Sequence, residues 1–358
     1  MDSPVPGRTT GGTAGRGAPV SRSGHVLGVD SGGSGLRIAV ARADAPGEPL
    51  VWSSAEPVVV GARGIDAADL LARVVPAAGD LLRQAGAGSL AAACVGAAGM
   101  ATLGDDLRAT LPKALADAFG VRRLALAADG VTAYAGALGQ RPGAVVAAGT
   151  GLIALGTAPG GGWRRADGWG HLLGDCGSGA WIGRAGLEAA MRAHDGRRGG
   201  SPALLACAEK MFGPAGELPG VLYPRPDRPA VLASFAPEVG RCAEDGDPVA
   251  VAVLRDAARH IAEAAEAVCP PAPAAAPGAD GSPADTPGPG CAVALTGGLF
   301  RMGEVLLAPV RDELATRLPH AEPRAAAGDP LAGAVGIAAA LATGTLRLPP
   351  DPALLHIL

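Results

Sequence analysis

The chain has 358 residues, including 56 glycines and 32 prolines, and carries a formal net charge of −4 with 48% hydrophobic residues. This length suggests about two domains, and the acidic balance provides no basic surface for nucleic acid. No apolar run predicts a membrane span, and no apolar segment follows the N-terminal arginines as in a secretory signal. We therefore expect a cytoplasmic protein that contacts neither membrane nor nucleic acid.

Lysine and cysteine narrow the chemistry further. The only lysines are Lys113 and Lys210, and neither follows a glycine as the lysine of a Walker A loop does. Any nucleotide must then be held by backbone amides, carboxylates and a metal. The six cysteines lie at least 22 residues apart and form no C-x-x-C pair, so we expect free thiols in a reducing compartment.

The first elements predict a hairpin. Residues 1–24 are rich in Gly, Ser, Thr, Pro and Arg, which predicts a disordered tail. The apolar run 26–30 leads into the glycine-rich turn 31–35, and residues 36–41 then alternate with period two, which predicts a strand. A dinucleotide-binding fingerprint requires a helix at that place. We therefore predict a glycine-tipped β-hairpin and exclude a Rossmann fold.

The later elements alternate between strands and helices. Strands are predicted at 91–95 and 124–127, and a second hairpin at 144–155 around Gly149-Thr150-Gly151. Helical spacing marks residues 182–193 and 250–268, the latter after the Asp247-Pro248 cap. Residues 270–290 form a low-complexity insertion that we expect to be flexible, and the strand 292–295 runs into Gly297-Gly298. This alternation favours an α/β fold.

Glycine turns of this kind can cradle a polyphosphate, because glycine lets the backbone amides approach an anion closely. Asp30 ends the strand beside the first turn, where a carboxylate could hold Mg²⁺ through water. Each hairpin alone could be an ordinary tight turn. Two matched hairpins and a strand followed by Gly-Gly favour a phosphate site.

Asp129 follows the strand at 124–128 and precedes a helical stretch. It could be a plain N-cap or a general base at the carboxyl end of a strand, where α/β sheets bind ligands. The local sequence alone favours neither interpretation over the other. In the glycine-rich segment 168–179, Trp169 is a sugar platform or a packed anchor, and Asp175 binds hydroxyls or caps the next helix. His171 is interpreted as structural.

These motifs resemble a known family. The strings DSGGSGLR, ADGVTAYAGAL, VVAAGTGLIALG, GWGHLLGDCGSGAWIGR, GDPVA, ALTGGLF and GDPLAGAVGIA occur in this order. They resemble the BadF/BadG/BcrA/BcrD ATPase family and, within it, N-acetylglucosamine kinases, over residues 26 to 342. That family belongs to the actin-like ATPase superfamily. The resemblance implies two RNase H-like domains of mixed β-sheets flanked by helices, with the nucleotide in the cleft between them. We expect them at 25–137, completed by a helix at about 331–345, and at 138–330.

The resemblance also implies roles for individual residues. Asp129 corresponds to the catalytic base and contacts the sugar, together with Gly168, Trp169, Gly170 and Asp175. ATP would be bound by the two phosphate loops and an adenosine motif, comprising Asp30, Gly32, Gly33, Ser34, Gly149, Thr150, Gly151, Gly297 and Gly298. Asp30 would also serve Mg²⁺. Departures from the family pattern are Cys176, where Glu is common, and Leu152 and Ile153, where polar residues touch the sugar in some members.

We therefore predict an ATP-dependent kinase that phosphorylates the 6-hydroxyl of N-acetylglucosamine or a related amino sugar, in a chain that could form a homodimer. Two alternatives remain. One is an ATPase activator of a radical dehydratase, which would need interface cysteines for an iron–sulfur cluster. The other is a non-catalytic sugar or nucleotide sensor, for which the apolar Leu152 and Ile153 leave room.

Overall fold

A computed structural model describes residues 24–32, 35–56, 58–61, 64–100, 104–158, 160–272 and 291–358. Residues 1–23 of the expected tail and 273–290 of the expected insertion lie outside the described residues. Within the described ranges, no helix is long and apolar enough to cross a membrane.

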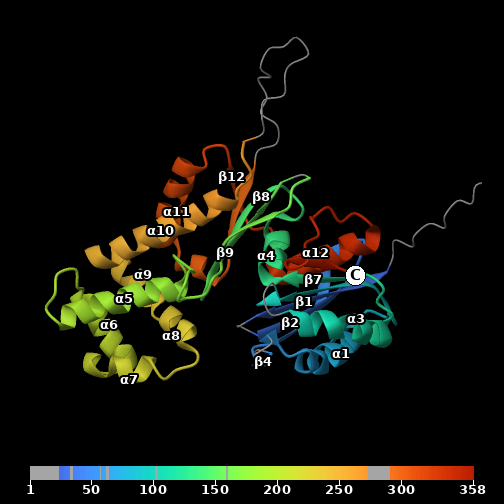
Figure 1. Ribbon diagram of the computed structural model, residues 1–358, viewed down its shortest axis with the longest axis horizontal. Helices are drawn as coiled ribbons and strands as arrows, with labels where there is room; N and C mark the ends of the chain where they lie inside the picture. Colours follow the sequence, from blue (N-terminus) through green and yellow to red (C-terminus); the bar gives the residue numbers. More distant parts are fainter. Residues whose placement is uncertain are drawn as a thin grey trace, which may run out of the picture.

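The first sheet has six strands in the order β13-β7-β6-β1-β2-β3 (Figure 1). β1, β2 and β3 are antiparallel neighbours, β6 and β7 run parallel to β1, and β13 pairs with β7 in the antiparallel sense. The strands are β1 (His25–Gly32), β2 (Gly35–Arg42), β3 (Ala45–Ser54), β6 (Leu90–Ala97), β7 (Leu124–Ala128) and β13 (Leu355–Ile357). A separate two-stranded ribbon contains β4 (Val60–Gly61) and β5 (Gly64–Ile65).

The second sheet repeats this plan in the order β10-β9-β8-β11-β12. Its first three strands in sequence are again antiparallel, and the last two run parallel to the first. The strands are β8 (Gly143–Ala148), β9 (Leu152–Thr157), β10 (Trp163–Asp167), β11 (Ala292–Thr296) and β12 (Glu322–Ala325). The two mixed sheets share a five-strand order, to which the first sheet adds the edge strand β13, and this confirms the predicted RNase H-like fold class.

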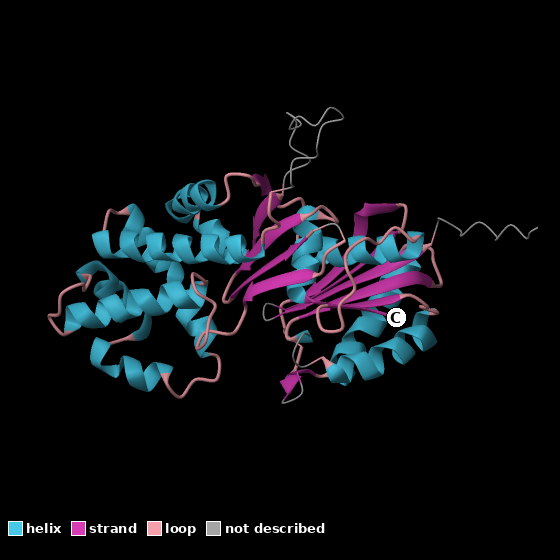
Figure 2. Cartoon of the chain, turned by 45° about the horizontal axis from the view of Figure 1, so that its top comes forward, coloured by secondary structure: helices cyan, strands magenta, loops and turns pink. Residues whose placement is uncertain are grey.

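Helices cover both sheets (Figure 2). α1 (Ala67–Gln84) packs on β1, β2 and β3, α3 (Asp105–Phe119) packs on α1, and α10 (Pro248–Val268) lies on β8, β9 and β10 with α11 (Glu304–Arg317) against it. A group of helices without strands occupies one end of the molecule in both views. It contains α5 (Gly179–His194), α6 (Pro202–Phe212), η1 (Ala215–Glu217), α7 (Leu218–Leu222), α8 (Arg228–Ser234) and α9 (Ala236–Glu244).

Two glycine-rich helices connect the sheets. α4 (Asp129–Leu138) contacts strands of both sheets, and α12 (Pro330–Thr343) packs on α4, β1 and β6. Their backbones touch closely, because a Cβ at Gly333 would overlap the carbonyl oxygen of Thr132, and one at Gly136 would overlap that of Asp329. Only glycine permits such a close approach of the two helices.

The core divides at the second sheet. Successive residues of a strand face opposite sides, and in β8 Val145 belongs to the core shared with the first sheet, whereas Val146 belongs to the core under α5, α9, α10 and α11. β2 is buried on both faces because α1 and α12 cover its two sides. The predicted helix at 250–268 begins as expected, since the carboxylate of Asp247 accepts bonds from the amides of Val249 and Ala250.

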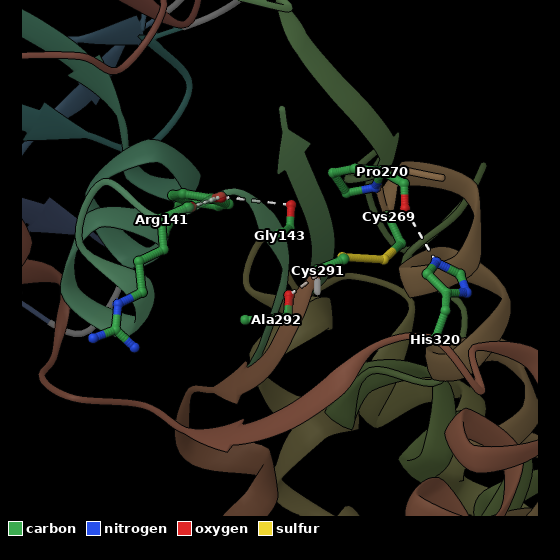
Figure 3. The surroundings of a disulfide bond; sticks show 8 residues. Arg141, Gly143, Cys269, Pro270, Cys291, Ala292 and His320 are labelled. Atoms are coloured by element: carbon green, nitrogen blue, oxygen red, sulfur yellow. Dashed lines mark hydrogen bonds between the residues drawn. A yellow bond between two sulfur atoms is a disulfide. The ribbon is translucent and has the colours of Figure 1, made fainter. Parts of the chain in front are cut away.

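The cysteine prediction is wrong for two of the six residues. Cys269, at the end of α10, and Cys291, just before β11, form a disulfide (Figure 3). They meet because α10 packs on β8 and β11 pairs with β8, which brings both ends of the intervening stretch together. The ring of His320 bonds the carbonyl of the adjacent Pro270 at 3.1 Å. Cys94, Cys176, Cys207 and Cys242 are free.

Candidate active site

The first glycine turn joins β1 to β2, and their antiparallel register pairs Gly32 with Gly35. Gly35 has a φ of 130°, and a Cβ there would overlap the carbonyl oxygen of Ser54, so this position requires glycine. A Cβ at Gly32 would meet no atom of the described residues within 4 Å. Gly33 and Ser34, the other predicted ligands of this loop, lie outside the described residues.

Asp30 is held by an arginine that the sequence analysis did not single out. The Arg37 guanidinium donates to one Asp30 oxygen, Oδ2, from Nη2 at 2.6 Å and from Nε at 3.0 Å. Its Nη1 bonds Asp329, the N-cap of α12. Burial raises the pKa of Asp30, and the bonds from Arg37 oppose this shift without reversing it. Arg37 and Asp329 both lie in motifs of the family resemblance, but they are 292 residues apart in the chain, so the sequence does not reveal their contact.

The second turn, between β8 and β9, is fixed to the start of α5. The amides of Gly179 and Ala180 donate to the carbonyls of Gly149 and Thr150, at 2.9 and 3.0 Å. Gly149 is open, like Gly32, whereas a Cβ at Gly151 would lie 2.5 Å from an oxygen of Asp175. The turn is therefore closed against protein on one side and open on the other.

Asp129 lies at the first residue of α4, directly after β7. The N-cap of this helix is Ala128, and the Asp129 carboxylate accepts the amide of Gly130 at 2.9 Å. Solvent reaches Asp129, yet the surrounding protein desolvates its carboxyl and raises the pKa. The charge of Asp30 raises this pKa further, and Arg165 lowers it. Asp30 and Asp129 thus lie near each other at the same edge of the first sheet.

Only two non-glycine residues in the described ranges have a positive φ, namely Asp167, the last residue of β10, and Asp175 in the segment that follows it. The Asp167 carboxylate accepts the amides of Asp175 at 2.5 Å and Cys176 at 2.9 Å. The Asp175 carboxylate accepts the amide of Gly170 at 3.1 Å. These bonds fold the loop back on itself and compensate for two strained backbone positions. Asp167 immediately precedes the recognised motif and was missed.

This folded loop presents an aromatic ring beside a cation. The Arg165 guanidinium lies 4.5 Å from the centre of the Trp169 ring and donates to the carbonyls of Asp167 and Gly168. Trp169 is 62% exposed, so it is not the packed anchor of the alternative interpretation. Ser178, and not Asp175, caps α5. Burial raises the pKa of Asp175, the amide of Gly170 lowers it, and the charge of Asp167 raises it.

His171, interpreted as structural, has a buried Nε2 without a hydrogen-bond partner among the described residues.

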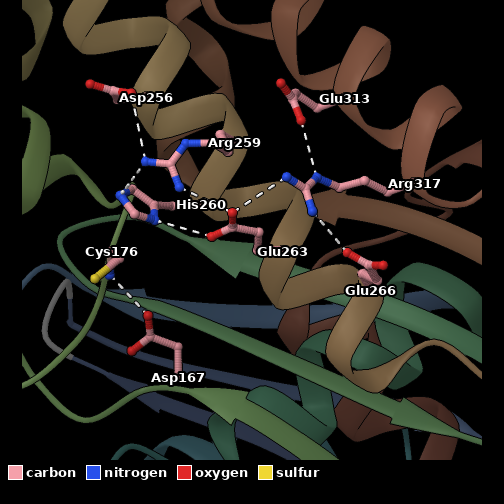
Figure 4. Close-up of polar contacts among 9 residues, drawn as sticks. All are labelled: Asp167, Cys176, Asp256, Arg259, His260, Glu263, Glu266, Glu313 and Arg317. Carbon is pink, nitrogen blue, oxygen red and sulfur yellow. Dashed lines mark hydrogen bonds and ion pairs between the residues drawn. The ribbon is translucent and has the colours of Figure 1, made fainter.

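Beneath the loop, Figure 4 shows the Asp167–Cys176 bond close to a network of ion pairs on α10 and α11. Arg317 reaches Glu266 at 3.0 Å and Glu313 at 3.1 Å, and so ties the two helices together. Because these groups are partly exposed, water screens each pair.

The predicted adenosine motif adjoins the second turn. β11 runs parallel to β8, so their carboxyl ends lie side by side. Gly297 has a φ of 107°, and a Cβ there would overlap the carbonyl oxygen of Ala148 at the end of β8. Gly298 has open space where a side chain would be. The structure therefore brings Gly297 and Gly298 to the turn that contains Gly149.

These features fit a nucleotide and a metal. At Gly32, Gly149 and Gly298 an added Cβ would meet no described atom within 4 Å, so the backbone there can be approached closely. Both bonds from Arg37 go to Oδ2 of Asp30, so neither of them occupies Oδ1. The hydroxyl of Ser31, at the base of the first turn, is buried without a partner among those same residues, and such groups normally bond a ligand or water.

Comparison with known proteins decides the family. The model of the BadF/BadG/BcrA/BcrD ATPase family matches residues 27–338. The chain belongs to this family. The prediction made from the motifs is thereby confirmed.

Individual members add detail. The inferred N-acetylglucosamine kinase of Chromobacterium violaceum is 30% identical, with 88% of this chain and 98% of that one covered and a TM-score of 0.61. A second solved structure, the inferred N-acetylglucosamine kinase of Porphyromonas gingivalis, is 16% identical and shares the fold with a TM-score of 0.62. The match covers 87% of this chain and 97% of that one. A Clostridium acetobutylicum N-acetylmuramic acid/N-acetylglucosamine kinase is 42% identical over 69 residues, which span 19% of this chain and 22% of that relative.

Proposed function

We propose that this protein is an ATP-dependent amino-sugar kinase that phosphorylates the 6-hydroxyl of N-acetylglucosamine, with Asp129 as the general base. The observation that carries the proposal is the position of Asp129. It is a solvent-accessible carboxylate with a raised pKa, at the carboxyl end of β7, with Asp30 near enough to influence its charge. Family membership and the 30% identity to an inferred N-acetylglucosamine kinase support the same reaction.

The two glycine turns would position the phosphates of ATP. The open faces at Gly32 and Gly149 would let backbone amides approach the phosphate oxygens. Mg²⁺, bound through water to Asp30, would offset phosphate charge. Phosphoryl transfer depends mainly on such positioning and electrostatics.

Asp129 would accept the proton of the attacking hydroxyl. Its bond to the Gly130 amide uses Oδ1 and orients the carboxylate. The raised pKa brings the group closer to the range in which a base works well near neutral pH. Trp169 would bind the apolar face of the sugar, and Asp175 would bind its hydroxyls. Gly168 and Gly170 would allow the backbone of this loop to approach the sugar closely. Closure of the two units would exclude water.

The test is a coupled assay of ADP release with N-acetylglucosamine, N-acetylmuramic acid, glucosamine and glucose, followed by NMR of the product to locate the phosphate. Asp129→Asn should lower kcat by about 10²–10⁴-fold. Asp117→Asn, which removes the partner of Lys113 on the exposed side of α3, is the matched control and should leave kcat unchanged.

Each failure has a distinct meaning. If no sugar stimulates ADP release, the kinase proposal is wrong; sugar binding without turnover would then favour a sensor, and ATP hydrolysis coupled to an oxygen-sensitive iron centre would favour a dehydratase activator. Full activity of Asp129→Asn would refute the base. Phosphate on another hydroxyl would correct the position alone.

A further inference from the structure

Two cysteines that take no part in the proposed reaction face each other in the helical region. Cys207 lies on α6 and Cys242 on α9, and their sulfur atoms are 3.8 Å apart. The side chains are 8% and 2% exposed. Two sulfurs at this distance are in van der Waals contact, and a disulfide would bring them to about 2 Å.

A cation lies against one of the two sulfurs. Nη2 of Arg241 is 2.8 Å from Sγ of Cys207 and also contacts Glu238 at 2.9 Å. Nη1 of the same guanidinium contacts Asp245 at 3.3 Å. The guanidinium therefore places a hydrogen-bond donor and a positive charge directly against the Cys207 sulfur. The two cysteines therefore differ, because Cys207 has the cation and Cys242 is the more buried.

The pair opens to solvent through a pocket of about 480 Å³. It is lined by Ala203, Ala206, Cys207, Arg241, Cys242, Asp245, Gly246 and Asp247. A small reagent could thus reach the sulfurs although little of either side chain is exposed. None of these residues belongs to the glycine turns or to the segment 168–179 that is proposed to bind the sugar.

We propose that Cys207 and Cys242 form a reactive dithiol that exchanges with low-molecular-weight disulfides such as oxidised glutathione. The thiolate of Cys207 attacks one sulfur of the reagent, the disulfide of the reagent breaks, and one glutathione thiolate leaves. Cys242 then loses its proton to solvent and attacks Cys207, which releases the second glutathione. The protein dithiol is oxidised to a disulfide, and one oxidised glutathione is reduced to two thiols.

The order of attack follows from the surroundings. Desolvation raises the pKa of Cys242 to about 11, so this group stays a thiol until a mixed disulfide forms beside it. Arg241 would stabilise charge on Cys207, both when this sulfur attacks and when it leaves in the reverse reaction. Cys94, which is fully buried with no thiol beside it, is the internal control.

The experiment treats the reduced full-length protein with oxidised glutathione, blocks remaining thiols with an alkylating agent and maps the peptides by mass spectrometry. We expect a Cys207–Cys242 cross-link, release of two glutathione thiols per cross-link, and Cys94 alkylated only after unfolding. Peptide mapping separates this bond from Cys269–Cys291. Cys242→Ser should trap glutathione on Cys207, and Cys207→Ser should leave Cys242 unmodified. Arg241→Gln should slow the first step several-fold, whereas Arg241→Lys should largely retain the rate.

Several results would overturn the proposal. The partly exposed free thiol Cys176 reports that the reagent is active, so Cys207 and Cys242 that stay free after Cys176 has reacted would be one such result. A stable glutathione adduct on wild-type Cys207 would be another. First attack at Cys242 would be the third. The wild-type mapping is decisive even if a serine variant fails to fold. Since the assay does not use ATP or sugar, its outcome is independent of the proposed kinase activity.

Discussion

Removal of the Arg37 guanidinium should destabilise the protein through the carboxylate that it neutralises. Arg37→Gln keeps a polar side chain of similar length but removes the charge and both bonds to Asp30. The Asp30 side chain is 15% exposed, so its negative charge would remain largely desolvated without a partner. An unpaired buried charge is costly.

The size of the effect follows from exposure. Breaking a fully buried pair costs about 3–5 kcal/mol, and an exposed pair contributes about 0–1 kcal/mol. Because Arg37 is 35% exposed, water screens part of the interaction, and we expect about 1–3 kcal/mol. Each kcal/mol lowers the Tm of a domain of about 150–250 residues by about 2–4 °C.

The pH dependence has a definite sign. The folded-state pKa of Asp30 is raised above its ordinary value, so the folded state binds the proton more tightly than the unfolded state. Ionisation of Asp30 therefore costs stability as the pH rises through the raised pKa. Without Arg37 this pKa should rise further. The deficit of Arg37→Gln should be complete at neutral pH and should shrink as the pH falls through that range.

Thermal unfolding of the wild type, Arg37→Gln, Asp30→Asn and the double variant at neutral and mildly acidic pH would measure this. In the Asp30→Asn background, Arg37→Gln should cost much less, with a remainder from its bond to Asp329. An equal cost in both backgrounds, or a deficit that grows in acid, would refute the reasoning.

Three further outcomes are expected. The kcat of the proposed kinase should fall as the pH drops through the raised pKa of Asp129, because only the carboxylate accepts a proton, and a pH profile without this limb would contradict its role as base. Gly333→Ala should destabilise the protein by about 1–3 kcal/mol, since the added Cβ would overlap α4. Gly336→Ala on the same helix would meet no described atom within 4 Å and should stabilise the protein by about 0.5–1 kcal/mol. Calorimetry would compare the unfolding of the two variants. Gly151→Ala should raise the KM for the sugar far more than Gly149→Ala, because only the former displaces the Asp175 carboxylate, which lies 2.5 Å from the added Cβ; equal sugar KM values would show that the contact is unimportant.

Much of the local structure could be predicted from the sequence, since it depends on neighbouring residues. Period-two alternation predicted β2, and the runs around Gly149 predicted β8 and β9. The Asp247-Pro248 pair predicted the start of α10, because both residues act within the first helical turn. The family motifs supported the two-sheet fold and the proposed site residues.

Other features escaped sequence reasoning because they involve distant segments. β13 is only three residues long and exists as a strand because β7 offers it an edge. The disulfide depends on how α10 and β11 pack on β8. Asp167 can accept the amide of Asp175 because its own backbone has a positive φ, and nothing in the amino-acid sequence indicates this conformation.

The sequence by itself determined the glycine turns, because turn geometry and strand alternation are set by residues a few positions apart, and its motifs identified the family by resemblance. Only the tertiary structure decided which charges meet. Asp30, Arg37 and Asp329 are joined because α12 returns to the first sheet and places its N-terminus beside β1 and β2. Electrostatic energy depends on distance in space and on exclusion of water, and neither can be read along the chain.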